Sequence, residues 1–491
     1  MSEHVISEKE AVSPQMRLSA TPALLPLMLL SLYLMFAPVW APAISSRVYD
    51  DARYLQLGML LLQVLSLAIR PIRNGVLAAW NDLGRVVRAL ILVFLVGGVI
   101  STIVSNAPLL GALELGLMVQ LVFLTLLVCS LVRLHGVTAN RALVVAACAG
   151  AGLICLQFWL MQMLSLAEGR PFSWAFPFLN FANVRFFSQY QSYVLMLLPL
   201  PLLVLPLSRV WKAVLYLVGA NFWALQWMVG TRAIWVALIV TVLMVCLVTR
   251  RGRLAFLRTH ALMILGGAII FAAFLVATAK VDEVTAIPKV NSVVKRGSGS
   301  INERIALARI AFGAIVDKPL TGVGPGQFGL RDYPLRAAHP HSAPLQLLSE
   351  YGLIAGGAGV ALGLALVIFA ARSMRGKRYS EHDTITISVA AALVMGLTES
   401  LFSGGIVMPH AQTMLCIVAG WLLGRRLPVR TEPFVAAHFP KIRLAVILSV
   451  CAAATVTTLL AIDYWSVVWD MPISAQPWHP HFWQYGRFGA W

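Results

Sequence analysis

A polar segment with two histidines and several glycines interrupts an otherwise apolar chain. It covers residues 321–357 and reads TGVGPGQFGLRDYPLRAAHPHSAPLQLLSEYGLIAGG. His339 and His341 flank a proline, which limits the local backbone, and an imidazole with a pKa of about 6.5 can take a proton from a hydroxyl group. Glycines such as Gly324 allow a ligand to come close to the backbone. We therefore expect chemistry in this segment, although a loop histidine can also be purely structural.

Three arginines are expected on the same outer side of the protein as this segment. Arg185 and Arg232 stand at the outer ends of the sixth and eighth apolar runs, and Arg304 lies in INERIALARIAFGAIV. Guanidinium forks pair with phosphate oxygens, so three converging arginines would suit a pyrophosphate. A single arginine at such a place more often anchors a helix at the membrane interface. Glu350 and Glu399 could orient the histidine or the arginines, whereas a capping or pairing role is the simpler reading of Glu350.

Metal binding is the alternative interpretation of the HPH triplet, which recurs in the tail at residues 479–481. Metal sites need further nitrogen, sulfur or carboxylate ligands, and neither a carboxylate nor a cysteine has a supporting spacing. The six cysteines all fall within apolar runs, where small buried side chains are common. We therefore predict that the protein uses no metal and no other cofactor.

The elements that must position these residues are helices that cross a membrane. Hydrophobic residues make up 59% of 491 positions and charged residues 12%, and the mean hydropathy is +0.81, which excludes a soluble globular protein. Lipid-exposed sheet edges are forbidden in a bilayer, and apolar runs of about 20 residues each suffice to span it. The predicted fold class is all-α: a polytopic integral membrane protein with about 12–13 transmembrane helices and a long periplasmic loop that contains helices.

The thirteen predicted spans follow from these apolar runs. They cover residues 22–46, 52–70, 86–105, 109–132, 140–166, 187–208, 212–229, 233–249, 259–279, 351–371, 384–404, 408–424 and 442–463.

The net charge of +18 is interpreted as a topology signal. Basic residues concentrate in connections such as 250–258 and 372–378, which identifies these connections as cytoplasmic. Arg53 is expected among the few basic residues of the outer connections. The polar, partly acidic N-terminus does not resemble a cleaved signal peptide, so we expect it in the cytoplasm and the C-terminus outside. Nucleic acid is not an expected partner.

The chain divides into four predicted regions. Residues 1–279 would form an N-terminal membrane bundle of nine spans, residues 280–350 a periplasmic catalytic loop, residues 351–463 four further spans, and residues 464–491 an aromatic tail on the outer surface. Within the loop, residues 301–316 predict a helix with one apolar stripe flanked by arginines, which fits a helix that lies along the membrane surface.

These motifs resemble a known family. The pattern G-V-G-x-G-x-F, followed by H-x-H-S-x-x-L-x-x-L-x-E-x-G, is similar to the signature of the O-antigen ligase/polymerase superfamily of bacterial envelope glycosyltransferases. The resemblance implies a GT-C-like architecture, with His341 as the essential histidine and Arg232 and Arg304 as essential arginines. It carries over to Arg185 more weakly. Gly324, His339, Arg185 and Glu350 are then expected to bind substrate.

The resemblance also implies an activity. Members of the superfamily transfer a glycan from undecaprenyl pyrophosphate to an acceptor hydroxyl on the periplasmic face of the bacterial inner membrane, and its ligases need no metal. The main hypothesis is an O-antigen ligase of lipopolysaccharide biosynthesis, with lipid A-core as acceptor. A polysaccharide polymerase and a protein O-oligosaccharyltransferase are alternatives within the superfamily. A lipid or polysaccharide transporter is an alternative from another class, which would usually show internal repeats and charges at mid-membrane depth.

Overall fold

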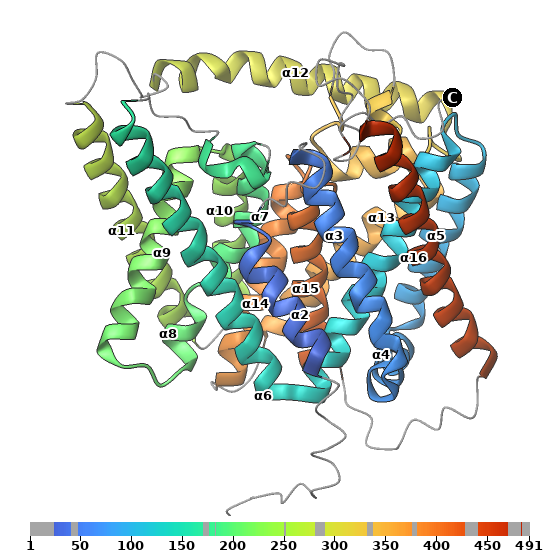
Figure 1. Ribbon diagram of the computed structural model, residues 1–491, viewed down its shortest axis with the longest axis horizontal. Coiled ribbons are helices and arrows are strands. Elements are labelled where there is room, and N and C mark those ends of the chain that lie inside the picture. The colour runs from blue at the N-terminus through green and yellow to red at the C-terminus, as the bar shows by residue number, and fades with distance from the viewer. Residues whose placement is uncertain are drawn as a thin grey trace, which may run out of the picture.

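The computed structural model describes ten stretches of the chain. They are residues 24–40, 48–169, 176–181, 183–249, 252–279, 290–330, 337–375, 381–427, 440–469 and the single residue 483. Within these stretches the regular secondary structure is helical and no strand occurs (Figure 1). The prediction of an all-α polytopic membrane protein is confirmed.

Fifteen α-helices follow one another along the described chain. They are α2 (Leu25–Phe36), α3 (Val48–Leu65), α4 (Arg70–Asp82), α5 (Arg85–Ile103), α6 (Pro108–Ala167), α7 (Val184–Leu197), α8 (Leu200–Val204), α9 (Arg209–Val229), α10 (Arg232–Val248), α11 (Arg253–Ala279), α12 (Val290–Asp317), α13 (Ala343–Met374), α14 (Glu381–Ser400), α15 (Pro409–Arg426) and α16 (Pro440–Trp469). Each of the thirteen predicted ranges overlaps at least one of these helices.

Five helices of the described chain are long and apolar enough to cross a membrane: α5, α6, α13 and most of α11 and α16. The bent pair α3 and α4, which meet at 103°, would make a sixth span, and three shorter apolar helices are α2, α10 and residues 384–400 of α14. A larger number of spans therefore depends on these shorter helices and on how α6 is counted.

Helix α6 contains two of the predicted spans. Its 60 residues would extend about 90 Å if straight, three times the bilayer core of about 30 Å. Its backbone is non-helical at Gly136, and the two halves turn there at the lower edge of the molecule (Figure 1). The break at one residue thus explains how a continuous helical segment supplies two spans.

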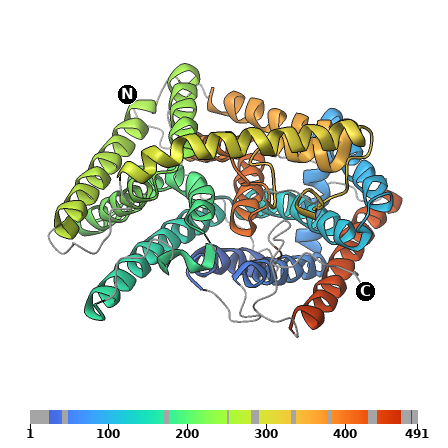
Figure 2. The same cartoon turned by 90° about the horizontal axis from the view of Figure 1, so that it is seen from above.

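The bundle has a buried centre and an exposed rim. In α6, 72% of the most apolar window is buried inside the protein, against 17% in α11. Helix α7 is buried almost throughout, and α14 packs between α7, α10, α13 and α15. Helix α12 lies across one end of this bundle, roughly perpendicular to the spans (Figures 1 and 2).

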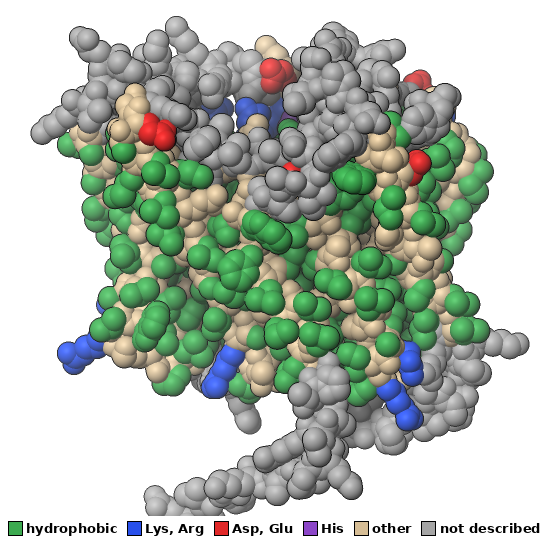
Figure 3. Space-filling view, in the orientation of Figure 1, with side chains coloured by type: hydrophobic (Ala, Val, Ile, Leu, Met, Phe, Trp, Pro, Cys, Tyr) green, Lys and Arg blue, Asp and Glu red, His purple; other side chains and the backbone are tan. Residues whose placement is uncertain are grey.

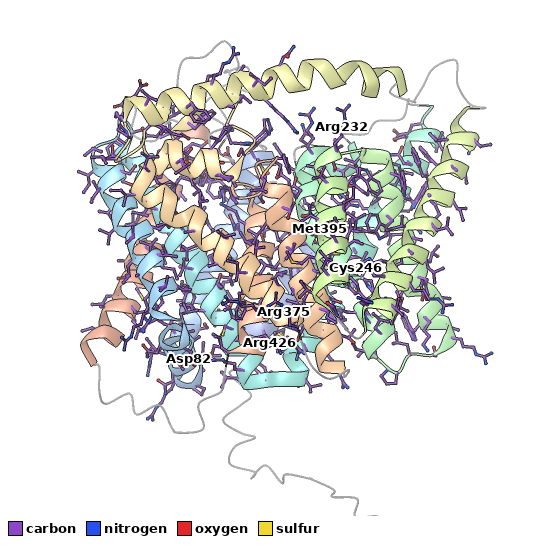
Figure 4. All side chains as sticks on the ribbon, turned by 180° about the vertical axis from the view of Figure 1, so that it is seen from behind. Asp82, Arg232, Cys246, Arg375, Met395 and Arg426 are labelled. Carbon is purple, nitrogen blue, oxygen red and sulfur yellow. The ribbon has the colours of Figure 1, made fainter. Side chains whose placement is uncertain are left out.

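Arginines lie at both ends of the bundle. Arg232 lies at the end covered by α12, whereas Arg375 and Arg426 lie at the opposite end (Figure 4). Basic side chains also line the lower edge in the space-filling view, and others appear just below α12 at the upper edge (Figure 3). The arrangement agrees with the predicted orientation, in which Arg375 and Arg426 are cytoplasmic.

The prediction that Arg53 lies in an outer connection is wrong. Arg53 belongs to α3 and is fully buried. Its guanidinium donates to the side chain of Gln412 and to the carbonyl of Val407, both at 2.7 Å. These partners are more than 350 residues away in the chain, and a buried cation needs such partners to offset its lost hydration.

The aromatic tail, residues 464–491, was predicted to lie on the outer surface. Of these residues the structure describes 464–469, which continue α16, and Trp483, which is not on the surface. Trp483 is 1% exposed, and its indole donates to a carboxylate oxygen of the buried Glu114 at 3.1 Å. Its ring packs edge-on against Tyr54 and Tyr464, with centroids 5.7 and 5.0 Å away. The tail therefore enters the bundle at this residue, because an indole buries a large apolar area while its N–H finds an acceptor.

Candidate functional site

The glycine loop, residues 322–328, is buried and closely hydrogen-bonded. The backbone N–H groups of Val323 and Gly324 donate to the carbonyls of Ser349 and Glu350 in α13, at 2.9 and 3.0 Å. The two carboxylate oxygens of Glu350 accept the N–H groups of Gly326 and Phe328. Glu350 is thus the centre of the loop's hydrogen bonding, and its predicted contact with substrate stays a prediction.

Position 324 requires glycine because another segment of the protein packs directly against its backbone. Its φ of +116° is a conformation that residues with a side chain rarely adopt. A Cβ at this position would lie 2.5 Å from the Cβ of Ser105, which follows α5. The neighbour that comes close to this glycine is therefore another segment of the chain, and a ligand contact at Gly324 stays a prediction.

The turn that carries His341 has an unusual backbone. His341 has a φ of +54°, the one positive value among the non-glycine residues that the structure describes, and this conformation costs about 1–3 kcal/mol. Its N–H donates to Nδ1 of the buried His339 at 3.2 Å. The ring of His339 in turn lies so close to Gly404 that a Cβ there would clash with it. The surroundings of His339 thus hold His341 in a strained position.

Arg304 and Arg185 act electrostatically on His341, and Arg232 acts on Arg304. Burial, followed by the charges of Arg304 and Arg185, lowers the pKa of His341 to about 4. The pKa of Arg304 is lowered by burial and by Arg185 and Arg232, while the carboxylate of Glu399 opposes this shift. The imidazole is therefore neutral near pH 7 and has a free electron pair for a proton. We call Arg185, Arg232, Arg304 and His341 the arginine–histidine cluster.

Four different elements bring the cluster together. Arg185 stands in the first turn of α7, Arg232 is the first residue of α10, Arg304 belongs to α12 above them, and His341 precedes α13. The structure thus brings together all three predicted catalytic residues and one of the four predicted binding residues, Arg185. Among the other three, His339 supports the cluster from beneath through its hydrogen bond to His341.

A tight turn places Arg232 at the mouth of its helix. Helix α9 ends at Val229, and Gly230, with a φ of +63°, forms its left-handed C-cap. Helix α10 begins two residues after this glycine. The N-terminal ends of α7 and α10 carry the positive ends of their helix dipoles, to which Arg185 and Arg232 add full charges. Like charges at these ends are unfavourable in an empty site and favourable once an anion binds.

A carboxylate lies at the edge of the cluster. Glu399 is buried at the end of α14, and its Oε2 accepts a hydrogen bond of 2.6 Å from Ser403. Its interaction with Arg304 agrees with the expectation that it could orient an arginine. The contact between Gly404 and His339 was not predicted, although the run SGG after an apolar span marks a place where the backbone can come close.

The metal interpretation involves two histidines that the structure describes, His339 and His341, and two that it does not. His479 and His481 lie outside the described residues. Among the residues that are described, no group of three or more His, Cys, Asp or Glu side chains is arranged to hold a metal ion.

Residues 222–358 match the family model described as O-antigen ligase. This match, over less than a third of the chain, supports the resemblance to the O-antigen ligase-like superfamily. A search of curated proteins finds no match. The matched O-antigen ligase segment contains Arg232, Arg304 and His341, and it ends before Glu399; Arg185 precedes it. The resemblance of the sequence motifs to this superfamily is thus confirmed.

Proposed function

We propose that the protein is a membrane glycosyltransferase that moves a glycan from undecaprenyl pyrophosphate to an acceptor hydroxyl on the periplasmic face of the inner membrane. The acceptor that we propose is lipid A-core, which makes the protein an O-antigen ligase. The observation that carries the proposal is a neutral imidazole, His341, near Arg304 and Arg185, with Arg232 acting on Arg304 at the membrane end covered by α12. The O-antigen ligase segment supports the same class of enzyme.

The cluster suits the charge of the proposed donor. Three guanidinium groups and two helix N-termini present positive charge to one region, and Glu399 offsets part of it. A pyrophosphate diester carries two negative charges and gains further charge as it leaves. Planar guanidinium forks can pair with its oxygens bidentately, and such preorganised charges stabilise a leaving group as its charge develops.

The chemistry balances with this chain's own groups. The acceptor oxygen forms a bond to the anomeric carbon of the glycan, while the bond from that carbon to the phosphate oxygen breaks. The acceptor's proton passes to the imidazole of His341, and the electron pair of the broken bond leaves with undecaprenyl pyrophosphate. Arg232 and Arg304 would neutralise the leaving group. The protonated imidazole, held among arginines, then returns its proton readily to water.

The direct test is a transfer assay with purified protein. Undecaprenyl-pyrophosphate-linked glycan and lipid A-core are mixed with the protein in the presence of EDTA, and the products are separated on gels. A shifted lipid A-core band supports a metal-independent ligase. A ladder of lengthened lipid-linked glycan, without shifted core, would identify a polymerase instead.

Two other results would contradict the proposal in different ways. Transfer only to an added acceptor protein would identify a protein O-oligosaccharyltransferase. Folded protein that forms no product with any acceptor, but moves the lipid-linked glycan between leaflets of a vesicle, would be a transporter.

A further inference from the structure

Helix α10 presents an apolar ridge directly below Arg232. Arg232 itself is exposed, and the exposed hydrophobic side chains that follow it on α10 are Val236, Ile239, Val240, Leu243 and Leu247, with exposed fractions of 43, 59, 38, 54 and 84%. Their spacing of mostly three or four residues puts them on one face of the helix, which is the face that carries Arg232. We call these five apolar side chains the α10 ridge.

The opposite face of α10 is fixed in the bundle. Ile234, Ala237, Leu238, Thr241 and Val245 are buried, and α14 is the main neighbour of the helix. Helices α11 and α13 touch α10 much less. Figure 4 shows α10 descending from Arg232 at the α12 end to Cys246 deeper in the bundle. The ridge therefore faces the lipid rather than another helix of the described chain.

The other two arginine-bearing helices of the cluster lack this combination. Helix α7 begins near Arg185 but is buried from Phe187 to Leu197, so nothing that binds Arg185 can extend down α7 into lipid. Helix α12, which carries Arg304, lies across the end of the bundle (Figure 2). Among these three arginine-bearing helices, α10 alone joins a cationic end to a lipid-facing apolar surface.

The dimensions fit an amphiphile with a charged head and a long apolar chain. From Arg232 to Leu247 the helix rises about 23 Å, which exceeds one leaflet of a bilayer whose core is about 30 Å thick. A molecule whose pyrophosphate binds at Arg232 must place its lipid chain beside the same helix within a few ångströms of that head.

We propose that the α10 ridge holds the polyprenyl chain of the lipid-linked donor, with its pyrophosphate at the arginine–histidine cluster. This proposal rests on the proposed function. The polyprenyl chain moves from apolar lipid to an apolar helix surface, so its contact with the ridge gains little from the hydrophobic effect. The ridge acts mainly by direction: it aligns the chain so that the pyrophosphate enters from the α10 side.

Photo-crosslinking tests where the chain lies. A benzophenone amino acid replaces Ile239 or Leu243 on the ridge, and Leu265 or Ile269, which are 59 and 61% exposed on α11, serve as matched lipid-facing controls. Each protein is illuminated with donor whose glycan is labelled. We expect several-fold more labelled protein from the ridge positions than from the controls, and we expect excess unlabelled donor to remove the difference.

Equal labelling at ridge and control positions, in protein that still transfers glycan, would overturn the ridge proposal and leave the proposed function intact. A wild-type protein that transfers no glycan to any acceptor would instead refute the proposed function. The two failures are therefore distinguishable in one set of experiments.

A bulky substitution gives an independent measurement. Leu243→Trp places a bulky side chain at the middle of the ridge and obstructs the polyprenyl chain there. KM for the full-length polyprenyl donor should therefore rise several-fold. KM for a donor with only two isoprene units, which ends above this position, should stay unchanged. Leu265→Trp on α11 is the control and should change neither value. An equal change with both donors, or no change with either, would contradict the proposal.

Discussion

The glycine loop and the arginine–histidine cluster both adjoin α13, and they differ in how their polar groups are satisfied. In the glycine loop, Glu350 and backbone carbonyls of α13 accept hydrogen bonds from successive N–H groups. In the cluster, Arg304 and Arg185 lower the pKa of His341, and Arg232 in turn lowers the pKa of Arg304. The first arrangement stabilises the empty protein. The second is unfavourable until an anion arrives, which is what a binding site for a pyrophosphate requires.

The largest expected effect on activity is at His341. His341→Ala should lower glycan transfer by about 10²–10⁴-fold, because the acceptor loses its proposed general base. Transfer to lipid A-core is measured at matched protein levels. Ser342→Ala is the neighbouring control, since Ser342 makes no side-chain hydrogen bond at the start of α13. Full activity of the histidine variant would remove His341 from the mechanism.

Arg304 gives the next largest expected effect. Arg304→Ala should lower turnover by about 10²–10³-fold, the usual loss when one group that stabilises a leaving anion is removed. Arg304→Lys keeps the charge without the bidentate fork and should recover part of the activity. Arg309→Ala, an exposed arginine on the same helix, should remain active. Comparable losses at Arg304 and Arg309 would show that only the overall charge of α12 matters.

Glu350 tests whether the hydrogen bonds of the glycine loop stabilise the empty protein. Glu350→Ala leaves the buried N–H groups of Gly326 and Phe328 without this acceptor, at a cost of about 1–3 kcal/mol for each. We expect a lower thermal midpoint in detergent, whereas His341→Ala should leave the midpoint nearly unchanged. Glu303→Ala, an exposed acid on α12, is the control. A normal midpoint together with lost donor binding would instead assign Glu350 to the substrate.

The smallest expected effect is a change in pH dependence. His341 must be neutral to accept a proton, and its pKa of about 4 predicts that activity falls on the acid side only near that pH. Removing the charge of Arg304 weakens the repulsion that lowers this pKa, so the acid limb of Arg304→Ala should move to higher pH. The residual activity of Arg304→Ala is measured across pH and compared with Arg309→Ala. A limb that stays in place would mean that the titrating group is not His341.

Hydropathy alone predicted most of the helices, because a bilayer demands long apolar runs. Helix α4 escaped prediction because only one face of it is apolar, with Ile72, Val76, Leu77 and Ala79 buried. Arg53 was misplaced for a different reason: its partners, Gln412 and Val407, lie more than 350 residues later in the sequence.

The site was predictable in its residue types and less so in its geometry. Motif resemblance singled out His341, Arg232 and Arg304, but only the fold shows that α7, α10, α12 and α13 bring them within reach of each other. Gly324 was predicted to admit a ligand, since a sequence cannot show that Ser105 lies against it. The lipid-facing side of α10 was not predicted either, because an all-apolar helix does not reveal which face its neighbours cover.

The central claim is that the cluster divides its work between holding the pyrophosphate and accepting the proton. Donor binding and single-turnover transfer are therefore measured side by side for the wild type, His341→Ala and Arg304→Ala. The account predicts that His341→Ala binds the lipid-linked donor as the wild type does but does not transfer the glycan, while Arg304→Ala binds the donor poorly. Loss of donor binding in His341→Ala, or rapid transfer by it, would contradict this division.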